Sequence, residues 1–176
     1  MKILITGGAG FIGSNLADFL VKSDHNVVII DDFSTGKREN LSNCIKKIEV
    51  IEEKVEDLDL TLLKNIDAVV HLAAQASVPL SISNFKESST TNLLSTFNIF
   101  DYCSQNKLPL VYASSSAVYG GIDLGDDEQI SVDLMTPYAV DKYTMELYSK
   151  VLWDLNGLSS IGLRFFNVYG PRQDPS

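Results

Sequence analysis

The chain has 176 residues, of which 45% are hydrophobic and 21% charged, with 11 glycines and 5 prolines. These values fit one folded α/β domain and exclude a disordered chain, a collagen and a disulfide scaffold. The 14 basic and 23 acidic residues give a net charge of −9, which repels a phosphate backbone, so nucleic acid is not an expected partner.

Six short apolar runs alternate with helical patterns, which predicts parallel βαβ units in one doubly wound sheet. The predicted strands cover residues 2–6, 26–30, 48–52, 68–72, 110–114 and 159–164. The predicted helices cover residues 11–23 and 60–64, a long segment ending near 106, and residues 137–156. Loops are expected at 31–40 and 119–136.

Apolar spacing suggests which helix faces point to the core. In the long third helix, one face is expected to carry Leu93, Phe97, Phe100 and Cys103. In the last helix, the core-facing stripe is expected to consist of Val140, Tyr143, Leu147 and Val151.

Two cysteines, Cys44 and Cys103, stand without a CxxC pattern or a neighbouring histidine, so we expect free, packed thiols and no metal site. His25 and His71 are expected to be structural, because neither is next to a carboxylate or a cysteine in the sequence. With no signal-peptide core and no apolar run of about 18 residues, we expect a cytoplasmic protein without a membrane partner.

The first predicted strand runs into a glycine-rich segment, Gly7-Gly8-Ala9-Gly10-Phe11-Ile12-Gly13. Glycines allow a tight turn and close backbone approach to a pyrophosphate, while the following helix N-terminus offers unpaired N–H groups to the anion. Since a strand precedes the segment and a helix follows it, the pattern predicts dinucleotide binding. The alternative is a turn that needs glycine only for packing.

Two aspartates, Asp31 and Asp32, close the second predicted strand. Asp31 would bind the adenosine ribose hydroxyls, and Asp32 could share this role. A carboxylate there repels a 2′-phosphate, so NAD is favoured over NADP, although Lys37 and Arg38 are nearby in the sequence.

Tyr138 and Lys142 have the i, i+4 spacing of one helix face, and the fifth predicted strand ends in Ser114-Ser115-Ser116 at the edge where such sheets bind ligands. A phenol has a pKa near ~10, which a neighbouring ammonium and a positive nicotinamide would lower. The pattern predicts Tyr138 as general acid/base, Ser115 as partner of the reacting oxygen, and Lys142 as ligand of the nicotinamide ribose. The alternative is a packed aromatic ring beside a snorkelling lysine.

Four segments together resemble the extended short-chain dehydrogenase/reductase family, and more narrowly its nucleotide-sugar epimerases, above all the UDP-sugar 4-epimerases. They are residues 7–13, 114–120, 137–142 and 163–172, supported by 34–41 and 71–74. The resemblance covers essentially the whole chain. It implies a Rossmann fold with NAD as cofactor and a nucleotide sugar, expected to be a UDP-sugar, as substrate.

The glycine loop, the catalytic spacing and this resemblance together give the expected site residues. The expected cofactor contacts are Gly7, Gly10, Phe11, Ile12, Gly13, Asp31, Asp32, Ser34, Gly36, Leu72, Ala73, Ala74, Ser114, Tyr138, Lys142 and Phe166. The expected substrate contacts are Ser77, Ser115, Ser116 and Asn167, and the expected catalytic residues are Ser115, Tyr138 and Lys142. Ser116 could replace Ser115 as the catalytic hydroxyl, and Asn92 matches an asparagine beside the family's catalytic centre.

The chain departs from the family pattern in three places. Lys54 falls where the family usually carries an aspartate that contacts adenine. Asp141 directly precedes Lys142, where a charge facing inward could weaken the lysine's effect on Tyr138, although an adjacent helix position is expected to point elsewhere. Family members continue into a smaller C-terminal part that closes over the nucleotide sugar. We therefore expect residues 1–176 to be a NAD-binding domain without that substrate domain.

The leading hypothesis is NAD-dependent epimerisation at carbon 4 of a UDP-sugar. Tyr138 would take the proton of the 4-hydroxyl while hydride passes to NAD and later returns to the other face. A 4,6-dehydratase is disfavoured because Ser116-Ala117 stand where such enzymes place Asp and Glu. A reductase or decarboxylase of the same family and a non-catalytic NAD-binding fragment stay open. The resemblance also implies a homodimer, and both polysaccharide and galactose metabolism are compatible with it.

Overall fold

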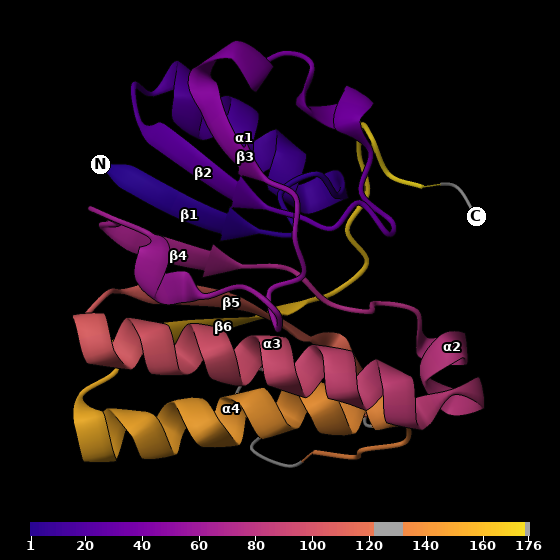
Figure 1. Cartoon of the computed structure of the whole chain (residues 1–176). Coiled ribbons are helices and arrows are strands. Elements are labelled where there is room, and N and C mark those ends of the chain that lie inside the picture. The colour runs from indigo at the N-terminus through magenta and orange to yellow at the C-terminus, as the bar shows by residue number, and fades with distance from the viewer. Residues whose placement is uncertain (122–131, 175–176) are drawn as a thin grey trace.

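The protein is described by a computed structural model that covers residues 1–121 and 132–174 (Figure 1). All six strands pair in parallel, in the order β3-β2-β1-β4-β5-β6. They are β1 (Lys2–Thr6), β2 (Asn26–Ile30), β3 (Ile48–Ile51), β4 (Ala68–His71), β5 (Leu110–Ser115) and β6 (Ser160–Phe165). The predicted doubly wound parallel sheet is confirmed, with strand ends shifted by one residue at most.

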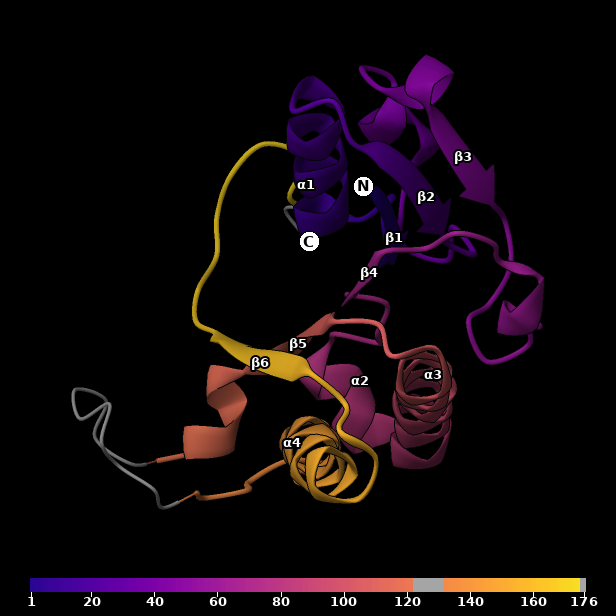
Figure 2. The ribbon, with the colours of Figure 1, turned by 90° about the vertical axis from the view of Figure 1, so that its left-hand side faces the viewer.

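In the described part of the chain, four α-helices connect or flank the strands: α1 (Phe11–Lys22), α2 (Val78–Ser83), α3 (Phe85–Asn106) and α4 (Pro137–Asn156). Helix α1 covers one face of the sheet, and α3 and α4 lie side by side on the other (Figures 1 and 2). The predicted helix at 60–64 is only a 3-10 turn, Leu60–Leu62. Part of the predicted loop 119–136 lies outside the described residues.

The register brings the carboxyl ends of the central strands to one edge. Thr6 at the end of β1 lies opposite Ile30 of β2 and His71 of β4. Strand order reverses between β1 and β4, because β2 and β3 lie on one side of β1 and β4 to β6 on the other. Open α/β sheets bind ligands in the crevice at such a reversal, so the fold places the predicted site between β1 and β4.

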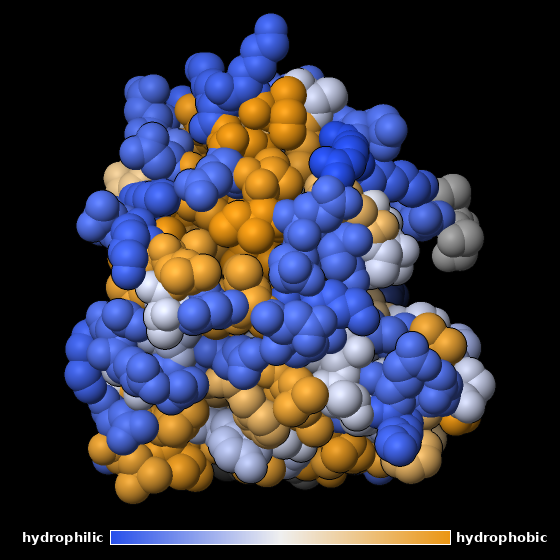
Figure 3. Space-filling model, in the orientation of Figure 1, coloured by the Kyte–Doolittle hydropathy of each residue, from blue (hydrophilic) through white to orange (hydrophobic). Residues whose placement is uncertain are grey.

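Helix α4 turns a different face to the core than its apolar spacing suggested. The expected core residues Val140, Leu147 and Val151 are 45%, 49% and 50% exposed. The buried positions are instead Ala139, Asp141, Lys142 and Met145. The prediction of this stripe was wrong because α4 buries charged groups toward the sheet edge and leaves its most apolar face outside. In Figure 3, hydrophobic residues gather along the lower margin of the molecule, over α4.

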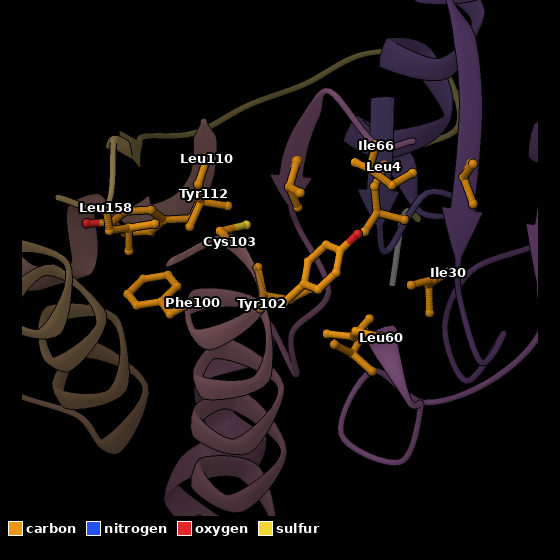
Figure 4. Packing of buried hydrophobic residues seen from close by; sticks show 14 of the residues in the cluster. Leu4, Ile30, Leu60, Ile66, Phe100, Tyr102, Cys103, Leu110, Tyr112 and Leu158 are labelled. Atoms are coloured by element: carbon orange, nitrogen blue, oxygen red, sulfur yellow. The ribbon is translucent and has the colours of Figure 1, made fainter. Parts of the chain in front are cut away.

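Two clusters of buried side chains fill the space between the sheet and its helices. On the side of α3 and α4, Phe100 and Tyr112 meet edge to face with ring centroids 5.3 Å apart, next to Cys103 and Leu158 (Figure 4). On the side of α1, the second cluster includes Ile5, Ala17, Ile29 and Cys44. Both cysteines are free and buried, as expected.

Among residues 1–121 and 132–174, no helix is both long and apolar enough to cross a membrane.

Candidate cofactor and catalytic site

The glycine-rich loop makes close backbone contacts that a side chain would prevent. Gly7 has φ +67°, and a Cβ there would lie 2.7 Å from the backbone nitrogen of Ala73. A Cβ on Gly13 would lie 2.4 Å from the carbonyl oxygen of Gly7. Helix α1 begins at Phe11 after Gly10, and no described side chain caps this end. Its first-turn N–H groups are thus placed to bind an anion, which fits the pyrophosphate of a dinucleotide.

The carboxylate of Asp31 is held beside this loop. Its oxygens accept hydrogen bonds from Ala9 N at 2.8 Å and from Phe33 N at 2.9 Å. Burial raises the pKa of Asp31, while the two backbone hydrogen bonds oppose that shift. A Cβ on Gly36 would lie 2.7 Å from Asp31 Oδ1, so this glycine lets the loop 31–40 fold over the aspartate. Asp31 and Gly36 therefore adjoin the glycine loop.

The neighbouring Asp32 is exposed and turned to its own loop. Its Oδ1 accepts hydrogen bonds from Ser34 N at 3.0 Å and from Ser34 Oγ at 2.6 Å. Asp32 and Ser34 thus form a local turn next to Asp31.

The loop after β4 packs directly against the glycine loop. Thr6 Oγ1 accepts hydrogen bonds from Leu72 N and Ala73 N, both at 3.2 Å. His71 is buried between Thr6 Oγ1, at 2.7 Å from Nδ1, and Thr96 Oγ1, at 3.2 Å from Nε2. Burial lowers the pKa of His71 to about 3, so the ring is neutral and links β1, β4 and α3. Residues 72–74 therefore lie beside Gly7.

Ser115, Tyr138 and Lys142 come together at the carboxyl end of β5. Thr136 caps α4 by accepting a hydrogen bond from Ala139 N at 3.1 Å, which starts the helix just before Tyr138. The Ser115 side chain lies close enough to the Tyr138 phenol to lower its pKa. Lys142 Nζ lies 5.7 Å from the centroid of the Tyr138 ring and donates to the carbonyl oxygen of Ala113 at 2.8 Å.

The electrostatics of this group differ from the sequence expectation. Burial raises the pKa of Tyr138, the hydrogen bond with Ser115 lowers it, and the charge of Asp141 raises it further. Burial also lowers the pKa of Lys142 to about 8, against the charge of Asp141. The expected lowering of the phenol pKa therefore does not come from the protein alone, because burial and the Asp141 charge outweigh the effect of Ser115.

Asp141 is itself only 2% exposed. The expectation that this position would point away was wrong, because Asn92 of α3 draws its carboxylate inward: Asn92 Nδ2 donates to Asp141 Oδ2 at 3.1 Å. The same amide contacts the backbone of Gln75, which follows the loop beside Gly7.

Other predicted site residues lie around this centre. Ser116 is half-buried in the 3-10 turn after Ser115, and Ser77 is exposed and caps α2 by accepting from Leu80 N at 3.3 Å. Phe166 and Asn167 are exposed beyond β6, and the Phe166 ring centroid lies 6.0 Å from that of Tyr119.

Ser114 points to the opposite side of β5 from Ser115. Its hydroxyl donates to Glu146, which also receives two hydrogen bonds from Arg164, at 2.9 and 2.6 Å. This Glu146–Arg164 pair was not predicted, because its partners lie far apart in the sequence on α4 and β6 and a long-range pair leaves no local signal.

The segment after β6 crosses to α1 at the other end of the sheet (Figures 1 and 2). Arg172 forms an ion pair with Asp18 of α1 at 2.5 Å, and Asn15 Nδ2 donates to the carbonyl oxygen of Pro171 at 3.0 Å. A Cβ on Gly170 would lie 3.3 Å from the Phe11 ring. These contacts hold the segment that carries Phe166 and Asn167 against the start of α1.

Fold and site together define a dinucleotide-binding α/β domain with a serine–tyrosine–lysine group at its ligand edge. The profile described as "NAD dependent epimerase/dehydratase family" matches residues 3–176. The chain belongs to this family, and NAD is its cofactor.

Several solved structures with similar folds are 4-epimerases. The UDP-N-acetylglucosamine 4-epimerase of Methanobrevibacter ruminantium, in complex with UDP-N-acetylmuramic acid, is 41% identical with a TM-score of 0.93, over 98% of this chain and 57% of that one. The UDP-glucose 4-epimerase of Thermus thermophilus, in complex with NAD, is 35% identical with a TM-score of 0.90. The match covers 100% of this chain and 58% of that one.

Curated relatives include different activities. A UDP-glucose 4-epimerase of Mycolicibacterium smegmatis is 37% identical over 99% of this chain and 58% of its own length. A UDP-N-acetyl-alpha-D-glucosaminuronate decarboxylase of Bacillus cytotoxicus is 36% identical over 97% of this chain and 56% of its own length. The chain thus spans somewhat more than half the length of the relatives it matches.

Proposed function

We propose that this chain carries the NAD-binding and catalytic part of a UDP-sugar 4-epimerase. The observation that carries the proposal is the grouping of Ser115 and Lys142 around Tyr138, at the same sheet edge as the glycine loop. Dinucleotide binding alone would not require that group.

The residues around the glycine loop fit NAD. The backbone of Gly7, Gly10 and Gly13 and the first turn of α1 would hold the pyrophosphate. Asp31, assisted by its neighbours Asp32, Ser34 and Gly36, would accept hydrogen bonds from the adenosine ribose. The nicotinamide side would be lined by Leu72, Ala73, Ala74 and Phe166, with Lys142 on its ribose. Ser114, which the sequence also suggested as a cofactor contact, is buried and gives its hydroxyl to Glu146 instead.

When bound, NAD supplies a hydride acceptor and donor and a positive charge near the phenol. Tyr138 takes the proton from the sugar 4-hydroxyl and gives it back after the sugar has turned. Ser115 donates a hydrogen bond to the reacting oxygen and steadies the phenol. The buried Lys142 favours the phenolate by its charge. Ser77, Ser116 and Asn167 would contact the nucleotide sugar.

The test is conversion of UDP-glucose and UDP-N-acetylglucosamine to their 4-epimers by the full-length protein, followed by NMR of the sugar anomeric protons. Tyr138→Phe keeps the ring but removes the proton carrier, and we expect a loss of at least about 100-fold in kcat. Tyr148→Phe, an exposed tyrosine on the same helix, is the matched control and should keep full activity. Equal activity of the Tyr138→Phe and wild-type proteins would contradict the assignment.

The second candidate is a decarboxylase of the same family, favoured by the relative from Bacillus cytotoxicus. Its product would be lighter than the substrate by one carbon dioxide, whereas epimerisation leaves the mass unchanged. Mass spectrometry of products from a UDP-sugar acid and from a neutral UDP-sugar distinguishes the two. A chain that binds NAD but turns over neither would be the non-catalytic module.

We also propose that the protein is a homodimer in the cytoplasm. The support for pairing is the apolar outer face of α4, where Val140, Leu147, Val151 and Leu155 are exposed (Figure 3). The cytoplasmic location rests on the sequence pattern alone. Sedimentation of the wild-type protein and of Leu147→Glu tests the dimer: the variant should sediment as a monomer, and a wild-type monomer would contradict the proposal.

A further inference from the structure

A buried carboxylate lies inside the catalytic helix where the reaction proposed above does not use it. Asp141 is 2% exposed and stands between Tyr138 and Lys142 on α4. Burying a charged group costs free energy unless hydrogen bonds or an opposite charge compensate it. Asp141 has both kinds of compensation, a hydrogen bond from Asn92 and the opposite charge of Lys142.

The hydrogen bonds of Asp141 lead to the loop beside the glycines. Asn92 Nδ2 donates to Asp141 Oδ2 at 3.1 Å and to the carbonyl oxygen of Gln75 at 3.3 Å, and Asn92 Oδ1 accepts from Gln75 N at 2.8 Å. A carboxylate can only accept, so it fixes which end of the Asn92 amide faces α4. The other end then faces Gln75 N. Asp141 thereby joins the catalytic helix to the loop 72–75 through one amide.

The opposite charge is Lys142. This lysine is also 2% exposed, and its Nζ donates to a neutral carbonyl, that of Ala113. Within residues 1–121 and 132–174 it has no carboxylate in direct contact, so the nearby Asp141 supplies the compensating field. The effect has the expected sign, because the Asp141 charge raises the pKa of Lys142 against burial and raises the pKa of Tyr138.

Among residues 1–121 and 132–174, the side chains that other elements present to this centre carry no competing charge. Helix α2 presents Ser81, whose Oγ accepts from Tyr138 N, and α3 presents Asn92 and Ser89. Strand β4 presents His71, which is neutral because its pKa is about 3. A hollow of about 430 Å³ beside Asp141 is lined by apolar and hydroxyl side chains of α3, α4 and residues 134–136. Within the described residues, Asp141 is the charged side chain that shifts the pKa of both Lys142 and Tyr138.

We propose that Asp141 is a positioning residue of this site, which orients Asn92 toward the loop 72–75 and supplies the negative charge that keeps the buried Lys142 protonated. The orientation and the charge are properties of the folded chain. Only the kinetic consequence rests on the proposed epimerase function.

The direct test is NMR titration of the protein labelled with ¹³C at the lysine ε-carbons. In the wild type, one lysine should titrate near pH 8, and its signal should be missing from Lys142→Met. Asp141→Asn keeps an oxygen that accepts from Asn92 but removes the charge. We expect the Lys142 midpoint to fall by about one unit in this variant. Asp141→Ser is a smaller neutral acceptor and gives a second measurement if Asp141→Asn does not fold.

The matched control is Asp154→Asn, the same charge change at an exposed position of α4, which should leave the midpoint unmoved. An unmoved midpoint in the neutral Asp141 variants, or an equal fall in Asp154→Asn, would overturn the proposal. In the full-length enzyme, loss of the Asp141 charge lowers the pKa of both Tyr138 and Lys142, so both limbs of the pH–kcat profile should move to lower pH. A uniform fall in kcat with unmoved limbs would show a structural role only and would also overturn it.

Discussion

Tyr138 and Lys142 occupy settings that oppose their charged forms. Burial raises the pKa of the phenol and lowers that of the ammonium to about 8. The folded protein therefore carries an unfavourable charge at neutral pH. Proteins accept such costs at functional sites, and the cost is measurable as a pH dependence of stability.

The first prediction concerns Lys142→Met. Because the folded-state pKa of Lys142 lies below its unfolded value of about 10.4, the unfolded chain binds more protons between pH 8 and that value, and stability rises with pH there. At pH 7 the methionine removes this penalty, of about 3 kcal/mol at most. The methionine also leaves the buried Asp141 without its opposite charge, a loss that does not change over this pH range. We therefore expect urea unfolding to show the stability of the wild type rising relative to Lys142→Met between about pH 8 and about pH 10.5. A constant difference at all pH values would contradict the buried charge.

The second prediction compares Gly7→Ala with Gly157→Ala. Both glycines have a positive φ, +67° and +69°, but only Gly7 has backbone within 3 Å of the added Cβ, whereas Gly157 faces open space. We expect Gly157→Ala to cost about 1 kcal/mol and to leave NAD affinity unchanged. Gly7→Ala should cost more and weaken NAD binding at least tenfold, measured by calorimetry. Equal effects of the two variants would mean that Ala73 does not confine the loop.

At the scale of elements, helix α4 shows where sequence reasoning succeeds and where it fails. Its bounds followed from Pro137 and Gly157, whose effects on helix ends are local. Its buried face did not follow, because apolar spacing favours the face with Leu147, while tertiary contacts bury the face with Met145. Long-range pairs give no local signal, so the contact between Asn92 and Asp141 could not be predicted either. The strands were predictable because two-sided burial requires continuous apolar runs.

The third prediction tests this orientation of α4. Met145 is 1% exposed and Leu147 is 49% exposed. Met145→Ala should lower the free energy of unfolding by about 2–5 kcal/mol because it leaves a cavity. Leu147→Ala should change it by less than about 0.5 kcal/mol when measured on the monomer in dilute urea. A larger loss of unfolding free energy for Leu147→Ala than for Met145→Ala would mean that Leu147 faces the core, as the apolar spacing predicted.

At the scale of the whole molecule, the segment after β6 ties the two halves of the sheet together. Asp18 and Arg172 are 154 residues apart, and their side chains are 10% and 18% exposed. The fourth prediction is that Arg172→Gln destabilises the protein by about 3 kcal/mol, because Asp18 is left buried without a charge partner. Lys37→Gln, at the exposed pair with Asp174, should cost less than about 1 kcal/mol. If Arg172→Gln and Lys37→Gln lost similar amounts of stability in thermal unfolding, the ion pair of Arg172 with Asp18 would not be what holds the segment after β6 to α1.

The central claim is that the glycine loop and the Ser115–Tyr138–Lys142 group share one NAD site. The most direct measurement is native mass spectrometry of the protein with NAD, in wild type, Gly13→Val and Tyr138→Phe. We expect one NAD per chain in the wild type and in Tyr138→Phe, since the phenol serves the reaction, and none in Gly13→Val, whose side chain meets Gly7 O. NAD retained by Gly13→Val, or absent from the wild type, would contradict the account.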